Sequence, residues 1–194
     1  MSPERARRVV FSVRDATPDD GAAIRAVADP AWHAAYDDRL GVAAVDRLVD
    51  AWYAPDDLRR EITDGGPFVV AEQPSGVIGF AQGRRVAGGD AALSRLYVHP
   101  DAWGRGVGTA LLGATARRLR PAGTLRAVVM AANAVGRAFY DRHGFTLRER
   151  RMTRLEGLAF EVVVLVAPLG PLCVLSPGVD RAVDDDSDGD QTTD

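Results

Sequence analysis

The pattern of apolar and polar positions divides the chain into a helical first part and a second part in which strands and helices alternate. Apolar residues recur at helical spacing through residues 19–63, with Trp32 and Tyr36 on one such face. Asp29-Pro30 has the chemistry of a helix start and predicts that a further helix begins there. We therefore expect a strand at 9–13 followed by a run of short amphipathic helices.

The period then changes to that of β-strands. Residues 68–71 and 77–81 flank a turn that contains proline and glycine, and residues 93–98 follow a second glycine-containing turn, which predicts an antiparallel meander. The remaining elements expected in chain order are a helix after Gly104, a strand at 125–130, a helix between Asn133 and Gly144, and strands at 145–151 and 160–166. This order predicts an α/β (α+β) fold, a single domain with a mixed, mostly antiparallel sheet of about seven strands flanked by helices.

Charge and composition separate this domain from the end of the chain. The formal net charge is −3, all 24 basic residues are Arg, and residues 180–194 contain seven Asp and one Arg. The rest of the chain is therefore weakly basic, without the strong positive excess of nucleic-acid-binding proteins. We expect a domain over residues 8–169 and an acidic tail over 170–194 whose composition is typical of disorder.

Other features predict a cytoplasmic protein with no partner in a membrane. Cys173 is the single cysteine, so no internal disulfide can form. The first residues lack the apolar core of a secretory signal. The most apolar stretch, residues 162–175, is shorter than a membrane span and contains Pro168 and Pro171.

A glycine-rich turn between the strand at 93–98 and the following helix has the features of an anion site. Gly104, Gly106 and Gly108 let an anion approach the free N–H groups of the first helical turn closely. Arg105 adds a charged donor and Thr109 a hydroxyl. A dinucleotide fingerprint is excluded because the glycine spacing differs, and a P-loop is excluded because the chain has no Lys.

At these residues the sequence resembles the GCN5-related N-acetyltransferase (GNAT) family. The segment 103–108 is similar to its cofactor signature, Gln/Arg-x-x-Gly-x-Gly/Ala, except that Trp103 stands where the family usually has Gln or Arg. Residues 96–100 resemble the family's fourth strand, and residues 133–145 resemble its second motif, N-x-x-(A/G)-x-x-(F/L)-Y-x-(R/K)-x-G-F. The resemblance covers residues 8–169. It implies acetyl-CoA bound between splayed parallel strands four and five.

The resemblance also implies the roles of individual residues. Tyr140 would protonate the leaving CoA thiolate, and the main-chain N–H of Val98 would stabilise the oxyanion. Asn133, Arg137 and Tyr140 share one helix face, which we expect to face a cleft, opposite an apolar stripe of Val135, Ala138 and Phe139. The residues expected to bind the cofactor are Leu96, Tyr97, Val98, Arg105, Gly106, Val107, Gly108, Thr109, Asn133 and Arg137.

The acceptor side is less specific in the sequence. Trp32 and Tyr36 resemble the family's acceptor-side helices and are the expected substrate contacts, with core packing as the alternative. No residue stands out as the general base; the candidates are Tyr36, Asp37, Asp38 and Glu72, because Ser94 and Arg95 beside strand four are poor bases. No metal site is expected, because His33, His99 and His143 are scattered without metal-ligand spacing.

The expected function is acetyl-CoA-dependent N-acetylation of a primary amine on a small molecule or a protein. A non-catalytic acyl-CoA-binding sensor or docking module is the alternative. An RNA-associated protein that uses the arginines at 148–154 is a third, less favoured class, and our expectation is no nucleic-acid partner. The resemblance also allows a homodimer.

Overall fold

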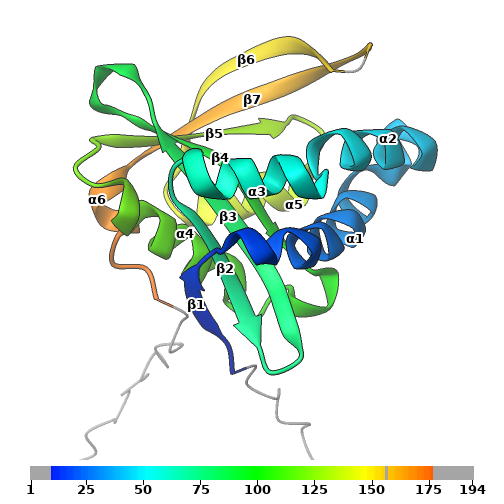
Figure 1. The fold of residues 1–194 in the computed structure, drawn as a ribbon. Helices are drawn as coiled ribbons and strands as arrows, with labels where there is room; N and C mark the ends of the chain where they lie inside the picture. Colours follow the sequence, from blue (N-terminus) through cyan, green and yellow to red (C-terminus); the bar gives the residue numbers. More distant parts are fainter. Residues whose placement is uncertain (1–9, 156, 177–194) are drawn as a thin grey trace, which may run out of the picture.

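A computed structural model describes residues 10–155 and 157–176 of the 194-residue chain. They form a seven-stranded mixed sheet with the strand order β1-β2-β3-β4-β5-β7-β6, which confirms the predicted fold class (Figure 1). The strands are β1 (Ser12–Asp15), β2 (Phe68–Gln73), β3 (Gly76–Arg85), β4 (Ala91–Val98), β5 (Thr124–Met130), β6 (Thr146–Leu155) and β7 (Leu158–Pro168).

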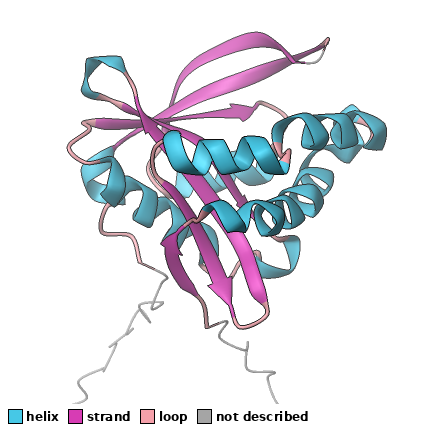
Figure 2. Ribbon diagram, in the orientation of Figure 1, coloured by secondary structure: helices cyan, strands magenta, loops and turns pink. Residues whose placement is uncertain are grey.

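Helices cover both faces of the sheet and divide the core into two layers (Figure 2). One layer, from α1–α3, packs on aromatic side chains such as Phe80; the other, from α4–α6, packs on aliphatic side chains such as Leu125 and Val163. In the described residues, no helix is both long and apolar enough to cross a membrane. The helices are α1 (Gly21–Leu40), α2 (Val42–Trp52), α3 (Pro55–Asp64), α4 (Val107–Leu119), α5 (Ala134–Arg142) and α6 (Leu169–Leu172).

The parallel strands β4 and β5 pair only at one end. Residues 91–93 of β4 pair with 125–127 of β5, and beyond Leu93 the two strands separate. β4 then stays paired with β3, and β5 with β7. A β-bulge leaves Ser94 without a partner between Leu93 and Arg95, and bulges increase the local twist of a strand. The splayed pair expected from the resemblance is therefore confirmed.

The N-terminal helical region differs in one respect from the sequence expectation. Pro30 does not start a new helix but lies inside α1, which runs without a break from Gly21 to Leu40. Ile24, Val27 and Trp32 on both sides of Pro30 are buried against the sheet. This continuous apolar face favours one helix, although proline removes a main-chain hydrogen bond.

At the C-terminus, packed structure extends past the expected domain boundary at residue 169. α6 begins at Leu169, and both Leu172 and Cys173 are buried against α4 and the sheet. Arg117 donates to the Cys173 and Leu175 carbonyls at 3.0 and 3.1 Å, which fixes this segment to α4. The expected acidic tail lies mostly outside the described residues. The strand expected at 9–13 is shifted along the chain, because β1 runs from Ser12 to Asp15, and residue 9 lies outside the described residues.

His33 on α1 lies among three carboxylates, two from its own helix and one from α2. Its Nδ1 is 2.8 Å from Asp37 Oδ1, and its Nε2 is 3.3 Å from Asp46 Oδ1 and 4.0 Å from Asp29 Oδ1. The hydrogen bond with Asp37 raises the pKa of His33 above its ordinary value, and the other two carboxylates act in the same direction against burial. Protonated His33 therefore links α1 to α2.

This link makes part of the stability depend on pH. Because the pKa of His33 is higher in the folded chain, its contribution is fully present below the unfolded pKa of about 6.5 and is lost as the pH rises through the folded pKa. We expect His33→Gln to cost more unfolding free energy at about pH 5.5 than at about pH 8.5, by less than about 1 kcal/mol because the pairs are partly exposed. Urea unfolding at both pH values measures this. An equal cost at both would contradict it.

Candidate functional site

The gap between β4 and β5 presents unpaired main-chain groups. His99 N donates to Ile78 O at 2.9 Å, and main-chain direction alternates along a strand. The main-chain groups of Tyr97 therefore face β3, whereas those of Leu96 and Val98 face the gap. Three β4 residues were expected to bind the cofactor. Leu96 and Val98 present main-chain groups to the gap, whereas Tyr97 can contribute only its side chain.

Trp103 connects this strand end to the glycine-rich turn. Its indole Nε1–H donates to the Val98 carbonyl at 2.7 Å, and the residue is 41% exposed. The Val98 carbonyl thus has a partner, whereas the Val98 N–H has none among the described residues. The position where the family usually carries Gln or Arg thus has a side chain that fixes the turn against the end of β4.

The glycine-rich turn and the start of α4 offer a row of free N–H groups. Six consecutive main-chain N–H groups, from Gly104 to Thr109, donate to no protein atom among the described residues. Gly106 is the N-cap of α4 and has a φ of 78°, a left-handed conformation that favours glycine. This row adjoins the positive end of the helix dipole, which is the arrangement that binds phosphate groups.

Helix α5 packs directly against this turn. A Cβ at Gly108 would lie 3.0 Å from the Phe139 ring, so a larger residue there would require the ring to shift by a few tenths of an ångström. Thr109 Oγ1 lies 3.0 Å from His143 Nε2, and His143 Nδ1 lies 2.7 Å from the Phe139 carbonyl. Since a carbonyl only accepts, Nδ1 carries a proton. His143 thus connects α4 to the end of α5 and engages the hydroxyl that the sequence assigned to an anion.

Asn133 joins the two sides of the gap. Its Oδ1 accepts from Gly136 N at 2.8 Å and caps α5, and its Nδ2 donates to the Tyr36 hydroxyl of α1 at 3.1 Å. One Nδ2 hydrogen stays available for a ligand. Arg137, by contrast, is exposed and donates to the Ala131 carbonyl at 3.0 Å.

Tyr140 has a buried ring and an accessible hydroxyl. The residue is 9% exposed and packs between Phe139 and Phe145, with ring centroids 5.2 and 5.0 Å away. Among the described residues its hydroxyl makes no hydrogen bond, yet no buried side-chain oxygen lacks a partner, so the hydroxyl reaches solvent. Burial raises the pKa of Tyr140 well above its ordinary value, and the nearby Tyr36 hydroxyl raises it further. The Tyr140 hydroxyl therefore holds its proton more strongly than an ordinary tyrosine does.

The burial pattern of α5 corrects one expectation. The stripe Val135, Ala138 and Phe139 is not the buried face, because Val135 is 65% exposed and Ala138 is exposed as well. The helix instead turns Gly136, Phe139 and Tyr140 inward. Val135 and Ala138 are apolar, but the close approach of α4 at Gly108 determines which side of this short helix is covered.

The two expected substrate contacts, Trp32 and Tyr36, are both buried on α1. Trp32 is 4% exposed and stacks on Tyr97, and its Nε1–H donates to the Tyr53 hydroxyl at 3.1 Å, so it packs in the core. Tyr36 is also buried, but its hydroxyl meets Asn133 at the gap.

Of the three carboxylates named as possible bases, Asp37 and Glu72 are engaged elsewhere, and Asp38 is exposed on α1. Asp37 pairs with His33. Glu72 pairs with Arg14 at 2.8 Å, on the β1 side of the sheet. Neither of these pairs lies at the gap, so the structure brings neither Asp37 nor Glu72 to it.

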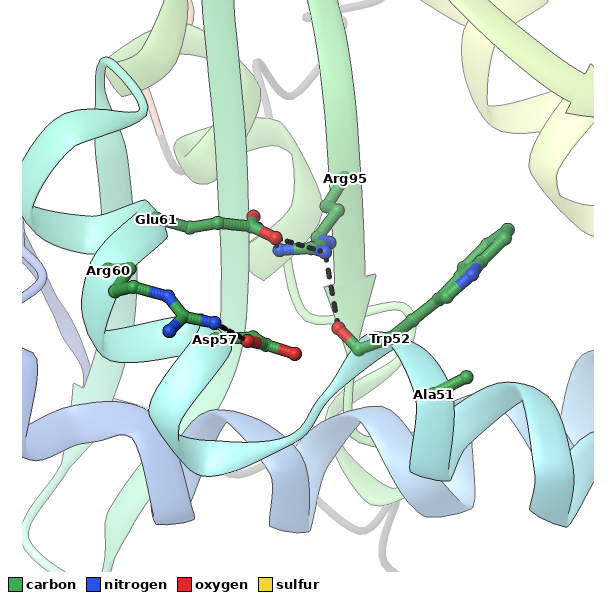
Figure 3. Close-up of a pocket in the computed structure, with 6 residues that line it drawn as sticks. All are labelled: Ala51, Trp52, Asp57, Arg60, Glu61 and Arg95. Carbon is green, nitrogen blue, oxygen red and sulfur yellow. Dashed lines mark hydrogen bonds and ion pairs between the residues drawn. The ribbon is translucent and has the colours of Figure 1, made fainter.

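A polar cluster that the sequence analysis missed lies between α3 and β4 (Figure 3). The Arg95 guanidinium donates to both Glu61 oxygens, at 2.5 and 3.2 Å, and to the Trp52 carbonyl at 3.2 Å. In Figure 3 the Glu61 and Arg95 side chains point toward each other, while the Trp52 ring points away from them. Arg95 comes from a strand and Glu61 from a helix 34 residues earlier, so no local motif could reveal the pair.

Comparison with known proteins decides the family. A model described as the acetyltransferase (GNAT) family matches residues 29–145, more than half of the chain. The chain belongs to the GNAT acetyltransferase family. No curated protein sequence matches it.

Solved GNAT structures share the fold at low sequence identity. The PaiA N-acetyltransferase from Thermoplasma acidophilum in complex with coenzyme A has a TM-score of 0.73 at 21% identity, covering 82% of this chain and 99% of that one. The acetyltransferase yncA from Salmonella typhimurium, described as putative and solved with acetyl-CoA, has a TM-score of 0.59 at 24% identity, covering 82% and 94%. The ribosomal-protein-S18-alanine N-acetyltransferase from Escherichia coli has 0.63 at 19%, again covering 82% and 94%.

Proposed function

We propose that this GNAT protein transfers the acetyl group of acetyl-CoA to a primary amine. The observation that carries the proposal is the combination of six free N–H groups at residues 104–109 with the unpaired edge of β4 beside them. The first fits a diphosphate and the second fits the amides of a pantetheine arm. Two of the solved GNAT structures hold coenzyme A or acetyl-CoA, which supports the same cofactor here.

The residues of the gap have complementary roles in this proposal. Acetyl-CoA supplies an activated thioester when bound. The N–H groups of Leu96 and Val98 face the gap and would stabilise negative charge on the thioester oxygen, with Val98 as the expected donor. As the amine nitrogen bonds the acetyl carbon, the carbon–sulfur bond breaks and Tyr140 gives its proton to the thiolate. The surplus proton of the amine would leave to water, and Tyr140 would take a proton back from water, which restores its hydroxyl.

The cofactor assignment predicts stabilisation by ligand. Acetyl-CoA at a hundredfold excess over its dissociation constant is expected to raise the free energy of unfolding by about 2.7 kcal/mol, because it binds only the folded chain. Thermal unfolding with and without millimolar acetyl-CoA measures this, and acetate at equal concentration is the control. An unchanged melting temperature would remove acetyl-CoA as ligand.

The transfer itself is tested by release of free thiol with a panel of amines. Thiol release that depends on the amine, with a product heavier by one acetyl group, supports the enzyme. Tight binding of acetyl-CoA without release would instead favour the acyl-CoA-binding sensor that the sequence left as the alternative.

A further inference from the structure

A pocket on the α1–α3 side of the sheet opens next to the β4–β5 gap. Its volume is about 380 Å³, and its lining includes Trp52, Glu61, Arg84, Ser94, Arg95 and Tyr97. We call it the acceptor pocket. It adjoins the smaller cavity of Figure 3, and the two share Trp52, Glu61 and Arg95.

The strand register places this pocket where an amine must arrive. Ser94 is the bulge residue, and Leu93 before it is the last β4 residue paired with β5, so the pocket begins where the two strands separate. Tyr97 lines it further along β4, on the stretch of the strand that is no longer paired with β5. A ligand in the acceptor pocket therefore lies beside the part of β4 that borders the gap.

Among the described residues, the charged side chains around the pocket form ion pairs with one exception, an arginine. Glu61 pairs with Arg95, and in the adjoining cavity Asp57 pairs with Arg60. Arg95 also donates to Gln82 Oε1 at 3.2 Å and to the Trp52 carbonyl, so both of its terminal nitrogens are engaged within the protein. Arg84 is exposed and forms no hydrogen bond or ion pair with any of the described residues, although it lines the pocket.

The positive charge of Arg84 determines which kind of acceptor the pocket favours. A guanidinium without a protein partner is a strong donor to a carboxylate, which it binds with two parallel hydrogen bonds. The Glu61 carboxylate is neutralised by Arg95 and repels an incoming anion little. The exposed Ser94 side chain at the bulge offers a hydroxyl near the same end of the pocket, and the Trp52 and Tyr97 rings supply apolar walls.

We propose that the acceptor is a primary amine that also carries a carboxylate, in the manner of an amino acid. Arg84 and Ser94 hold the carboxylate, and the amine points toward the β4–β5 gap. This substrate class rests on the acetyl transfer proposed above.

The test compares each of several amino acids with its own primary amide in the thiol-release assay. The amide has the less basic amine, which is neutral more often, so chemical reactivity alone favours the amide. We expect kcat/KM to be at least about tenfold higher for the acids, a ratio that a charge-assisted contact can supply. An equal or higher value for the amides would overturn the proposal while acetyl transfer stands.

Two arginine variants test whether Arg84 causes the preference for acids over amides. Arg84→Gln is expected to lower the acid-to-amide ratio by about tenfold, mainly through a higher KM for the acid. Arg59→Gln is the matched control, because Arg59 is exposed on α3 and lines neither cavity. A ratio unchanged by Arg84→Gln, or lowered equally by both variants, would overturn the assignment.

Binding separates a failure of this proposal from a failure of catalysis. Calorimetry with amino acids added to the CoA-bound wild-type protein, and with the same amides, does not need turnover. Preferential binding of the acids without thiol release would support the pocket and reject the transferase. Thiol release with no difference between acids and amides in either measurement would reject the pocket and support the transferase.

Discussion

Replacing Tyr140 by Phe is expected to lower turnover by about 10²-fold or more while the affinity for acetyl-CoA changes little. The hydroxyl is accessible to solvent and makes no hydrogen bond with the described residues, so its removal leaves no protein partner unsatisfied. The ring keeps its packing between Phe139 and Phe145. The variant therefore removes a proton donor and little else.

Two further measurements separate this role from a structural one. The free energy of unfolding of Tyr140→Phe should match the wild type, and the thermal shift with acetyl-CoA should persist. Burial raises the pKa of Tyr140 above its ordinary value, so the hydroxyl stays protonated, and loss of its proton should not limit the wild-type rate up to about pH 10. Wild-type turnover in the variant would remove Tyr140 from the mechanism.

Replacing Gly106 by Val should weaken acetyl-CoA binding by about tenfold. A branched side chain at a φ of 78° costs about 1–2 kcal/mol, and the turn can relieve this only by leaving the left-handed conformation that orients the free N–H groups. If binding must restore that conformation, the strain is subtracted from the binding free energy. Calorimetric titration with acetyl-CoA measures the change.

Gly88 provides a matched control for this strain. Its φ of 85° and ψ of 7° are close to those of Gly106, at 78° and −1°, and a Cβ there would meet nothing within 4 Å. It lies in the connection between β3 and β4, away from the gap. Gly88→Val should lower stability by a similar amount and leave the affinity unchanged. Equal losses of affinity in both variants would show that the effect is one of general stability.

Sequence patterns predicted those parts of the site that depend on local chemistry. A strand, alternating glycines and a helix follow one another within about twenty residues, so the turn with its row of free N–H groups could be recognised from spacing alone. The capping role of Asn133 was likewise predictable, because a cap acts on N–H groups of the next turn. The element order predicted the mixed sheet.

Patterns failed where packing between distant elements decided the outcome. Val135 and Ala138 were expected inside because they are apolar, yet α5 is too short for its own periodicity to fix which side is covered. Pro30 was expected to start a helix because proline favours that position locally, but the buried face of α1 extends across it. In both cases burial against another element outweighed the local preference.

The sequence by itself determined the order of strands and helices, the glycine turn before α4 and the position of Tyr140 on the helix that follows Asn133, because neighbours in the chain carry this information. Only the tertiary structure decided that β4 and β5 separate after Leu93, that Trp103 bonds the Val98 carbonyl, and that Glu61 neutralises Arg95 while Arg84 finds no partner among the described residues. Glu61 and Arg95 are 34 residues apart, and only the packing of α3 against the sheet brings them together. The ion pair between Glu61 and Arg95 depends on which face of the sheet α3 covers, and so does the charge of the acceptor pocket.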